Sequence, residues 1–349
     1  MYRHIWLFLL LTIGLHCEPT PESKPALFSQ GRHAVQTGWE QTPEKLEAAY
    51  CLGCHETSHA EWSRGQHAHA WTDPVFQEAF DHEPRQWCVN CHAPLESQEA
   101  AWRAEGARAP ELQEGINCAA CHVRQGEIIS IRVGNCDAGV VRARESFGSA
   151  EFCAGCHQFN FPTATNPLRY SDEPMQNTFA EWQAAGSKNE CHQCHYAGHE
   201  LVGGKNTDRM PNAFYDFSAE RDEGATIRLA FRIADRGHIL PTGDLYRSIA
   251  LEAAYDPGFQ RVYYRRRWAR YYQAGRRNET APEALIWNRD LKRNSGIRPE
   301  QDRITLTIDA PAGPVYIRLI RRFHDQSLGG RSRLPLAKRS ATIWSTVVY

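Results

Sequence analysis

The first part of this 349-residue chain has short helix-like stretches of apolar and polar residues. They include residues 43–50, 61–71 and 98–105, and segments rich in Gly, Pro and Asn separate them. Little of this part could build a conventional apolar core. We therefore expect bound apolar groups to supply the interior, with the helices and irregular segments packed around them.

After about residue 220 the pattern changes to alternation, with apolar residues at every second position. The predicted strands are residues 225–233, 248–255, 303–308, 315–320 and 342–349. Antiparallel strands with one buried face produce this alternation, so we expect a β-sandwich-like domain. The predicted fold class is α+β, with a mainly α-helical or irregular domain at 45–220 and the β-sandwich-like domain at 221–349.

The N-terminus carries an apolar run, residues 5–15, behind a short charged start. This run is too short to span a bilayer and is typical of a secretory signal, which we assign to residues 1–16. Residues 17–44 are a predicted linker that begins with Cys17 and a polar, proline-rich stretch. Lipidation of Cys17 and simple cleavage of the signal remain alternatives. Either way we expect an exported protein of the periplasm or outer cell envelope, anchored to the membrane if Cys17 carries lipid.

The charges are divided unevenly, although the formal net charge is only −1. Residues 1–220 hold 16 Lys/Arg and 28 Asp/Glu, a net of −12, while residues 221–349 hold 24 and 13, a net of +11. Attraction between the two parts of one molecule explains this asymmetry most simply. A basic docking face for an acidic partner is the alternative.

The strongest chemical signal is a C-x-x-C-H pentapeptide that occurs five times. Its cysteines are Cys51, Cys54, Cys88, Cys91, Cys118, Cys121, Cys153, Cys156, Cys191 and Cys194, and its histidines are His55, His92, His122, His157 and His195. This is the attachment signature of c-type haem, in which two thiols bond the porphyrin and the histidine binds the iron. Three-residue spacing puts both sulfurs on one side of a helical turn. We therefore predict five covalently attached haem c groups.

Chance, zinc and disulfides each account for the five motifs less well than haem does. Random placement of 12 Cys and 16 His predicts roughly 0.02 matches in the chain. Zinc knuckles would pair into tetrahedral sites, and neither zinc nor a disulfide framework explains a histidine after every pair. Consecutive motifs start 30 to 38 residues apart, which resembles an internal repeat with one haem per unit.

The ligand on the second face of each iron separates an electron carrier from a catalyst. Outside the motifs and the signal region, the candidates are His33, His59, His67, His69, His82, His192, His199, His238 and His324. This pool exceeds the number of irons, so a protein with two histidines on every iron fits the sequence. His59 and His199 follow a motif histidine by four residues, and each would reach a neighbouring haem more readily than its own.

Residues 261–272 mix arginines with aromatic residues. In a cytoplasmic protein this composition would suggest nucleic acid. An exported protein does not meet cytoplasmic nucleic acid, so we expect no nucleic-acid partner. An exposed strand whose arginines stack on tyrosines is the simplest interpretation, and contacts to haem propionates, a partner protein or anionic lipid are the functional ones.

Several segments resemble the cytochrome c-554-like multihaem cytochromes. They are Glu61-Trp62-x4-His67-Ala68-x-Ala70, residues 87–95, 115–123 and 175–182 with the last motif, and Gly237-His238-Ile239-Leu240-Pro241-Thr242-Gly243. The resemblance implies that His67 is the best distal ligand and that His238, reached from the β-domain, is the second. It extends more loosely to hydroxylamine oxidoreductase and pentahaem nitrite reductase, but the chain has no C-x-x-C-K motif and too few haem motifs for the oxidoreductase.

We therefore expect an exported pentahaem cytochrome that transfers electrons between redox partner proteins. The alternative is a haem-dependent oxidoreductase that acts on a small nitrogen or sulfur oxyanion at one five-coordinate haem, because members of the resembling family include such a haem. A third hypothesis makes the β-domain a module that docks the haem part onto a larger complex of the cell envelope.

Overall fold

The structure, a computed structural model, describes most of the chain after residue 33. The described residues are 34–349, except 83, 137–138, 166–167, 196–197, 205–212, 224, 235, 245–246, 275–288 and 324–332. The predicted signal, Cys17, His33 and His324 lie outside them, as does the side chain of His82. Within these ranges, no helix is both long and apolar enough to cross a membrane.

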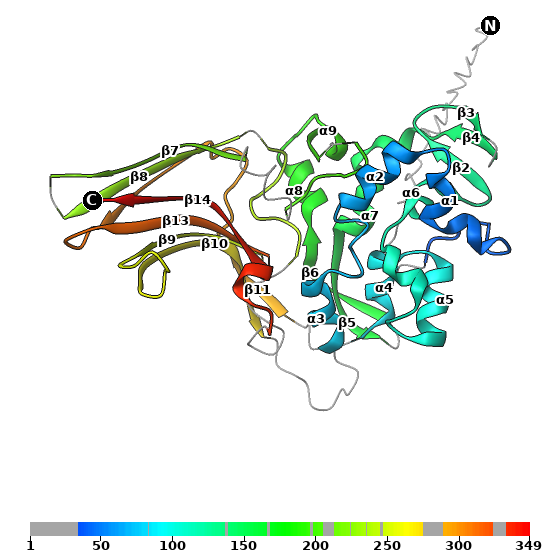
Figure 1. Ribbon diagram of the computed structural model, residues 1–349, viewed down its shortest axis with the longest axis horizontal. Coiled ribbons are helices and arrows are strands. Elements are labelled where there is room, and N and C mark those ends of the chain that lie inside the picture. The colour runs from blue at the N-terminus through cyan, green and yellow to red at the C-terminus, as the bar shows by residue number, and fades with distance from the viewer. Residues whose placement is uncertain are drawn as a thin grey trace, which may run out of the picture.

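Short helices make up most of the first part of the molecule (Figure 1). They are η1 (Pro43–Leu46), α1 (Ala48–Leu52), α2 (Glu56–Arg64), α3 (Pro74–His82), α4 (Gln86–His92), α5 (Glu96–Glu105), η2 (Pro110–Glu114), α6 (Cys118–His122), η3 (Glu145–Gly148), α7 (Ala150–His157), α8 (Thr178–Ala184) and α9 (Cys191–His195). Two small apolar clusters lie among them, one around Trp71 and Val89 and one around Leu95 and Ala120. The interior is thus divided among small clusters, as the composition predicted.

The helix predicted for residues 61–71 is wrong beyond Arg64, where α2 ends. Gly65 follows in an extended conformation, and its backbone passes so close to Glu200 that a Cβ there would lie 2.4 Å from the Glu200 carbonyl oxygen. The chain then turns, and His67 lies in this turn rather than on a continuous helix. A long-range backbone contact therefore ends the helix.

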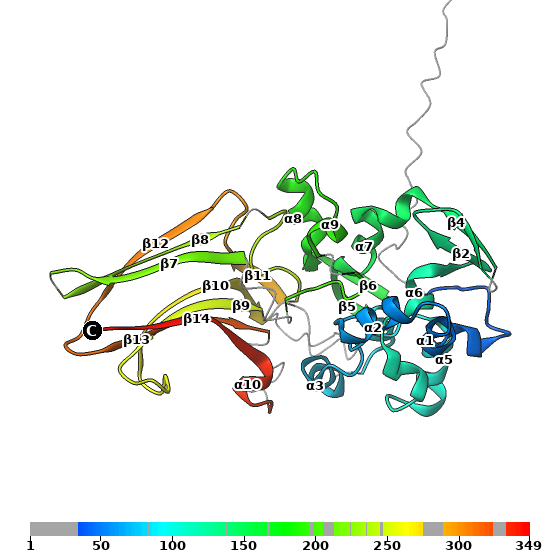
Figure 2. The same cartoon turned by 45° about the horizontal axis from the view of Figure 1, so that its top comes forward.

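Strands also occur within the haem-motif part, where none was predicted. Strands β1 (Val123–Arg124), β2 (Glu127–Ser130), β3 (Gly134–Cys136) and β4 (Gly139–Ala143) form a small sheet in the order β1-β2-β4-β3. A longer hairpin, β5 (Gln158–Thr165) and β6 (Leu168–Asn177), follows α7. The hairpin contacts α7 and α8 and lies near the middle of the molecule in both views (Figures 1 and 2).

The C-terminal part contains two facing antiparallel sheets. Its elements are β7 (Phe214–Arg221), β8 (Thr226–Ile233), β9 (Ser248–Ala254), β10 (Val262–Ala274), β11 (Arg289–Asn294), β12 (Arg303–Asp309), β13 (Val315–Arg322), α10 (Leu336–Arg339) and β14 (Ser340–Val348). The sheet orders are β11-β10-β9-β13-β14 and β12-β8-β7. The α+β prediction is confirmed, and five of these strands match the predicted ones. The first strand begins at Phe214, upstream of the domain boundary predicted at residue 221.

The alternating residues of both sheets form one apolar core. Leu229 and Phe231 of β8 face Leu251 of β9 and Ile317 of β13, and all four are buried. At one edge, the ring of Phe217 stacks on Trp344 at 4.8 Å between centroids. This core makes the sandwich a firm support for the loop that carries His238.

Candidate functional site

Each C-x-x-C-H motif lies on a helical turn. Helices α4, α6, α7 and α9 each end at the motif histidine. The first motif runs past the end of α1, but the Cys54 and His55 amides both donate to the Cys51 carbonyl oxygen, at 3.2 and 2.9 Å. The two cysteines of every motif are therefore one turn apart, as attachment to a single porphyrin edge requires.

Hydrogen bonds orient three of the motif histidines. Their Nδ1 atoms lie 2.6 Å from the Ala70 carbonyl oxygen for His92, 2.9 Å from Ile129 for His122, and 2.7 Å from Val202 for His195. A carbonyl can only accept, so Nδ1 carries the proton and Nε2 keeps its lone pair for a metal ion. These residues fit a haem iron in both chemistry and orientation.

Three motif histidines also face a second histidine ring. The ring centroids are 6.5 Å apart for His67 and His157, 6.2 Å for His122 and His199, and 6.1 Å for His195 and His238. Two imidazoles that each bind one metal ion at about 2.0 Å have ring centres roughly 6 Å apart. Each pair is therefore spaced as the two axial ligands of one iron would be.

The second histidines of these pairs come from distant segments. His67 follows the turn at Gly65, His199 follows the last motif, and His238 lies on the loop after β8. Burial lowers the pKa of His67, and it lowers that of His238 to about 4, against the opposing effect of the Ile239 carbonyl group. Both shifts favour the neutral imidazole, which is the form that binds iron.

The fourth predicted distal ligand, His59, has a different environment. Its ring packs against Trp62 of the same helix, at 5.3 Å between centroids. In the described ranges, no motif histidine faces the His59 ring at the spacing of the three pairs. His59 therefore stays a prediction from the sequence.

The first and third motifs lie side by side. The Cys51 and Cys118 thiols hydrogen-bond each other. The Glu114 carboxylate accepts from the Ala48 amide at 3.0 and 3.1 Å, and the Asn117 amide donates to Glu114 at 2.7 Å. Since Ala48 begins α1 and Asn117 caps α6, the carboxylate joins the two motif helices.

The fourth and fifth motifs are joined in the same way. The Cys153 and Cys191 thiols hydrogen-bond each other. The Ala150 amide at the start of α7 donates to the carboxylate of Glu190, which directly precedes Cys191, at 2.5 Å. In both pairs an alanine three residues before the first cysteine bonds a glutamate of the other motif.

Further contacts place the two pairs of neighbouring motifs, and the second motif, relative to each other. Cys121 of the third motif lies close enough to Cys156 of the fourth for their charges to interact. The second motif lies beside the fourth, because Trp87 packs edge-on against Phe159 at 6.3 Å between centroids. The motifs therefore form a row in the order first, third, fourth and fifth, with the second beside the fourth. Cys54 and Cys194, at the two ends of the row, are exposed.

The residues that join the motifs were not among those predicted from the sequence. Asn117 alone carried a local signal, since asparagine before a helix is a typical N-cap and its side chain accepts from the Ala120 amide at 3.1 Å. Glu114 and Glu190 act on helices far away along the chain. No local pattern predicts such partners.

Two comparisons with known proteins agree with this site. The family described as cytochrome c554 and c-prime matches residues 50–123, which contain the first three motifs. The fold is similar to that of a penta-heme cytochrome c552 from Thermochromatium tepidum, with a TM-score of 0.63 and 19% sequence identity over 86% of this chain and 97% of the other. No curated protein sequence matches the chain.

These findings confirm the resemblance to the cytochrome c-554-like multihaem cytochromes that the motifs indicated. The family match supports covalently bound haem c as the cofactor and a haem electron-transfer protein as the general class. Both conclusions agree with the five motif helices and with the three histidine pairs described above.

Proposed function

We propose that this chain transfers electrons between redox partner proteins of the cell envelope through five haems held by its C-x-x-C-H motifs. The ten motif cysteines would hold the porphyrins, and His55, His92, His122, His157 and His195 would each bind one iron. Each haem supplies a one-electron Fe(III)/Fe(II) couple when bound. The observation that carries the proposal is the row of motifs: the thiols of the first and third motifs are in contact, as are those of the fourth and fifth, and Cys121 of the third lies near Cys156 of the fourth.

Three of the irons would have histidine on both faces, because His199, His67 and His238 lie opposite motif histidines. Two protein ligands leave no coordination position for a substrate, which suits electron transfer rather than catalysis.

The exposed cysteines mark where partners would meet the row. Cys54 belongs to the first motif and Cys194 to the fifth, and these motifs form opposite ends. We propose that the donor and the acceptor dock near these two ends.

Haem content and electron transfer can be tested on the exported protein. The intact mass should equal that of the processed chain plus five haems, and the dithionite-reduced protein should be reoxidised fully by a redox dye. His238→Ala should convert one of five haems from low-spin to high-spin iron. A matched control is His59→Ala, which should leave the three low-spin pairs unchanged. Five haems that resist reoxidation by any partner or dye would contradict the proposal.

Export and anchoring belong to the same proposal. Residues 1–16 would direct export, and Cys17 would carry lipid at the cell envelope. Expression with labelled palmitate distinguishes the alternatives: label lost in Cys17→Ser indicates lipidation, and unlabelled protein cut near residue 16 indicates a simple signal. Cytoplasmic apoprotein without haem would contradict export.

A second candidate function concerns the first motif. His55 is exposed, and no second histidine ring faces it among the residues that the structure describes. We propose as the alternative that this iron is five-coordinate and acts on a small nitrogen or sulfur oxyanion. A high-spin signal that nitrite, hydroxylamine or cyanide shifts would support this, whereas five low-spin haems would exclude it.

A further inference from the structure

A buried arginine, two of whose nitrogens have no hydrogen-bond partner in the described part of the chain, lies where the β-sandwich meets the haem-motif part. Arg321, near the end of β13, is only 6% exposed. Its Nε and Nη1 atoms have no hydrogen-bond partner among the described residues. The guanidinium lies over the Phe323 ring, at 5.1 Å from the centroid. A buried charge with only an aromatic face beside it needs a counterion.

A second arginine, Arg247, lies next to it. Among the described residues, its Nη1 atom donates a long hydrogen bond of 3.4 Å to the Thr242 carbonyl oxygen. Burial and the charge of Arg247 together lower the pKa of Arg321 to about 10, so the two cations are close neighbours. Asp73 and Asp244 partly offset the charge of Arg247. Asp73, however, also caps α3, since its Oδ1 atom accepts from the Val75 and Phe76 amides at 2.8 and 3.1 Å.

A third arginine, Arg270, shows which way the site faces. In the sheet register, Arg321 pairs with Ile249, which in turn pairs with Trp268, so Arg321 and Arg270 lie on the same face of the sheet. Arg270 donates to the Met175 carbonyl oxygen at the end of β6, at 3.2 Å, and to that of Gly243. The arginines therefore face the haem-motif part and lie beside the loop that carries His238.

We propose that Arg321 and Arg247 bind a propionate carboxylate of the haem whose axial histidines are His195 and His238. Guanidinium groups bind carboxylates through two parallel hydrogen bonds, and both groups are planar. Arg247 lies close enough to His238 for their charges to interact, which selects this haem. The site also accounts for the charge asymmetry, because a basic sandwich here covers an acidic cofactor edge.

This inference rests on the proposed haem ligands. Its failure and the failure of the ligand assignment would nevertheless appear in different measurements. Loss of a ligand or of haem attachment appears in the mass and in the spin state. Loss of the propionate contact appears as a shifted potential with all five haems retained. The test does not depend on the direction of electron transfer or on the redox partners.

The test is a spectroelectrochemical titration of the pentahaem Arg321→Gln protein. A positive charge near a haem stabilises the reduced form, so its removal should make one midpoint potential more negative. We expect about a tenfold change in that haem's reduction equilibrium, which is about 59 mV for one electron. Arg247→Gln should shift the same haem, and the double variant should shift it by less than the sum.

Arg318→Gln is the matched control, since it removes the same charge from the same strand. Arg318 lies on the opposite face of the sheet, where it is bound to Glu252. All five potentials should then stay at their wild-type values. Equal shifts in Arg321→Gln and Arg318→Gln, or no shift in either, would overturn the proposal.

Two further measurements cover a folding failure and a free anion. If Arg321→Gln does not fold, Arg321→Lys replaces it, because lysine keeps the positive charge. Its midpoint potential should differ from that of the wild type by less than half of the shift expected for Arg321→Gln. A full shift in this variant would count against charge pairing. Sodium nitrite titrated into the wild type should leave the potentials unchanged. A potential that follows nitrite in the wild type but not in Arg321→Gln would show an exchangeable anion and overturn the propionate assignment.

Discussion

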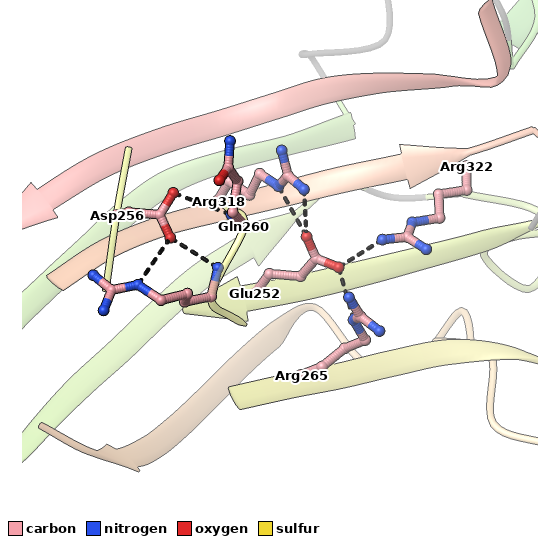
Figure 3. Close-up of polar contacts among 7 residues, drawn as sticks. Glu252, Asp256, Gln260, Arg265, Arg318 and Arg322 are labelled. Atoms are coloured by element: carbon pink, nitrogen blue, oxygen red, sulfur yellow. Dashed lines mark hydrogen bonds and ion pairs between the residues drawn. The ribbon is translucent and has the colours of Figure 1, made fainter. Parts of the chain in front are cut away.

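Glu252 supports the sandwich on the face of the sheet that points away from the apolar core. It lies in the middle of β9, paired with Arg265 of β10 and Arg318 of β13. Its Oε1 atom accepts from Arg265 at 2.7 Å and from Arg322 at 2.6 Å, and its Oε2 atom accepts from two Arg318 nitrogens at 2.9 and 2.7 Å (Figure 3). One carboxylate thus holds three strand arginines.

The burial of these side chains determines how much stability the sandwich loses when the Glu252 charge is removed. Glu252 is 0% exposed at its side chain, Arg318 is 16% and Arg322 is 13%, whereas Arg265 is 49% exposed. Breaking a buried ion pair by removal of one partner costs about 3–5 kcal/mol. An exposed pair such as that of Arg265 adds up to about 1 kcal/mol. Glu252→Gln, which keeps the side-chain shape, should therefore lower the free energy of unfolding of the sandwich by about 3–5 kcal/mol.

Hydrogen exchange measured by mass spectrometry follows the sandwich separately from the haems. This matters because a chain of this size need not unfold in a single step. We expect amides of β9, β10 and β13 to lose protection in Glu252→Gln, while the Soret band and haem content stay unchanged. The sandwich should melt roughly 10–20 °C lower.

The matched control is Asp256→Asn, which removes one carboxylate from the adjacent loop. The Asp256 side chain is 21% exposed and pairs with the exposed Arg261 at 4.0 Å (Figure 3). It also accepts from the Gln260 and Arg261 amides at 3.1 and 2.8 Å, and asparagine keeps one of these two acceptor oxygens. This variant should therefore melt much closer to the wild type than Glu252→Gln does. A loss below about 1 kcal/mol in Glu252→Gln would refute the reasoning, because it would mean that the arginines are solvated without the carboxylate.

Three further predictions concern the haem sites. Glu61→Gln should make the potential of one haem more positive, because the Glu61 carboxylate lies 3.6 Å from Nδ1 of His199; an unchanged set of potentials in a redox titration would contradict this. Glu114→Gln should lower the melting temperature followed at the Soret band, since the charged acceptor of the Ala48 amide contributes about 1.5–3 kcal/mol; an unchanged melting curve would show that the bond is dispensable. Burial depresses the pKa of His238 to about 4, so its neutral form contributes stability that is complete above about pH 6.5 and is lost as the pH falls toward 4. The low-spin spectrum should therefore hold down to pH 6.5, and a change to high spin above that pH would contradict the assignment.

The sandwich shows how far a local pattern can predict a fold. Residues 225–233 and 315–320 alternate because one side of each strand faces the core, and both form strands in the structure. The same reasoning did not reveal the hairpin β5–β6, which ends at Asn177 and whose register slips at several positions. Its shape depends on the helices and sheet around it, which local propensity does not include.

For the proposed iron ligands, too, the sequence predicted one part and the tertiary structure showed the rest. The five motifs were clear from the sequence because the two thiols and the histidine that would hold one haem lie within five residues. The second histidines that face the motif histidines come from segments distant along the chain. His67 faces His157, and His238 from the sandwich loop faces His195. Helical spacing predicted that His199 would serve a motif other than its own, and the structure places it opposite His122.

By itself, the sequence determined the number of C-x-x-C-H motifs, the cysteines in them and the strands of the sandwich, because each depends on neighbours within one turn or one strand. Only the tertiary structure decided which motifs touch and which histidines face each other. It also decided that Arg321 and Arg247 meet beside His238, with two Arg321 nitrogens unpartnered among the described residues. These features depend on contacts between segments far apart in the chain, and the burial that shifts pKa values and strengthens charge pairs exists only once those segments have packed.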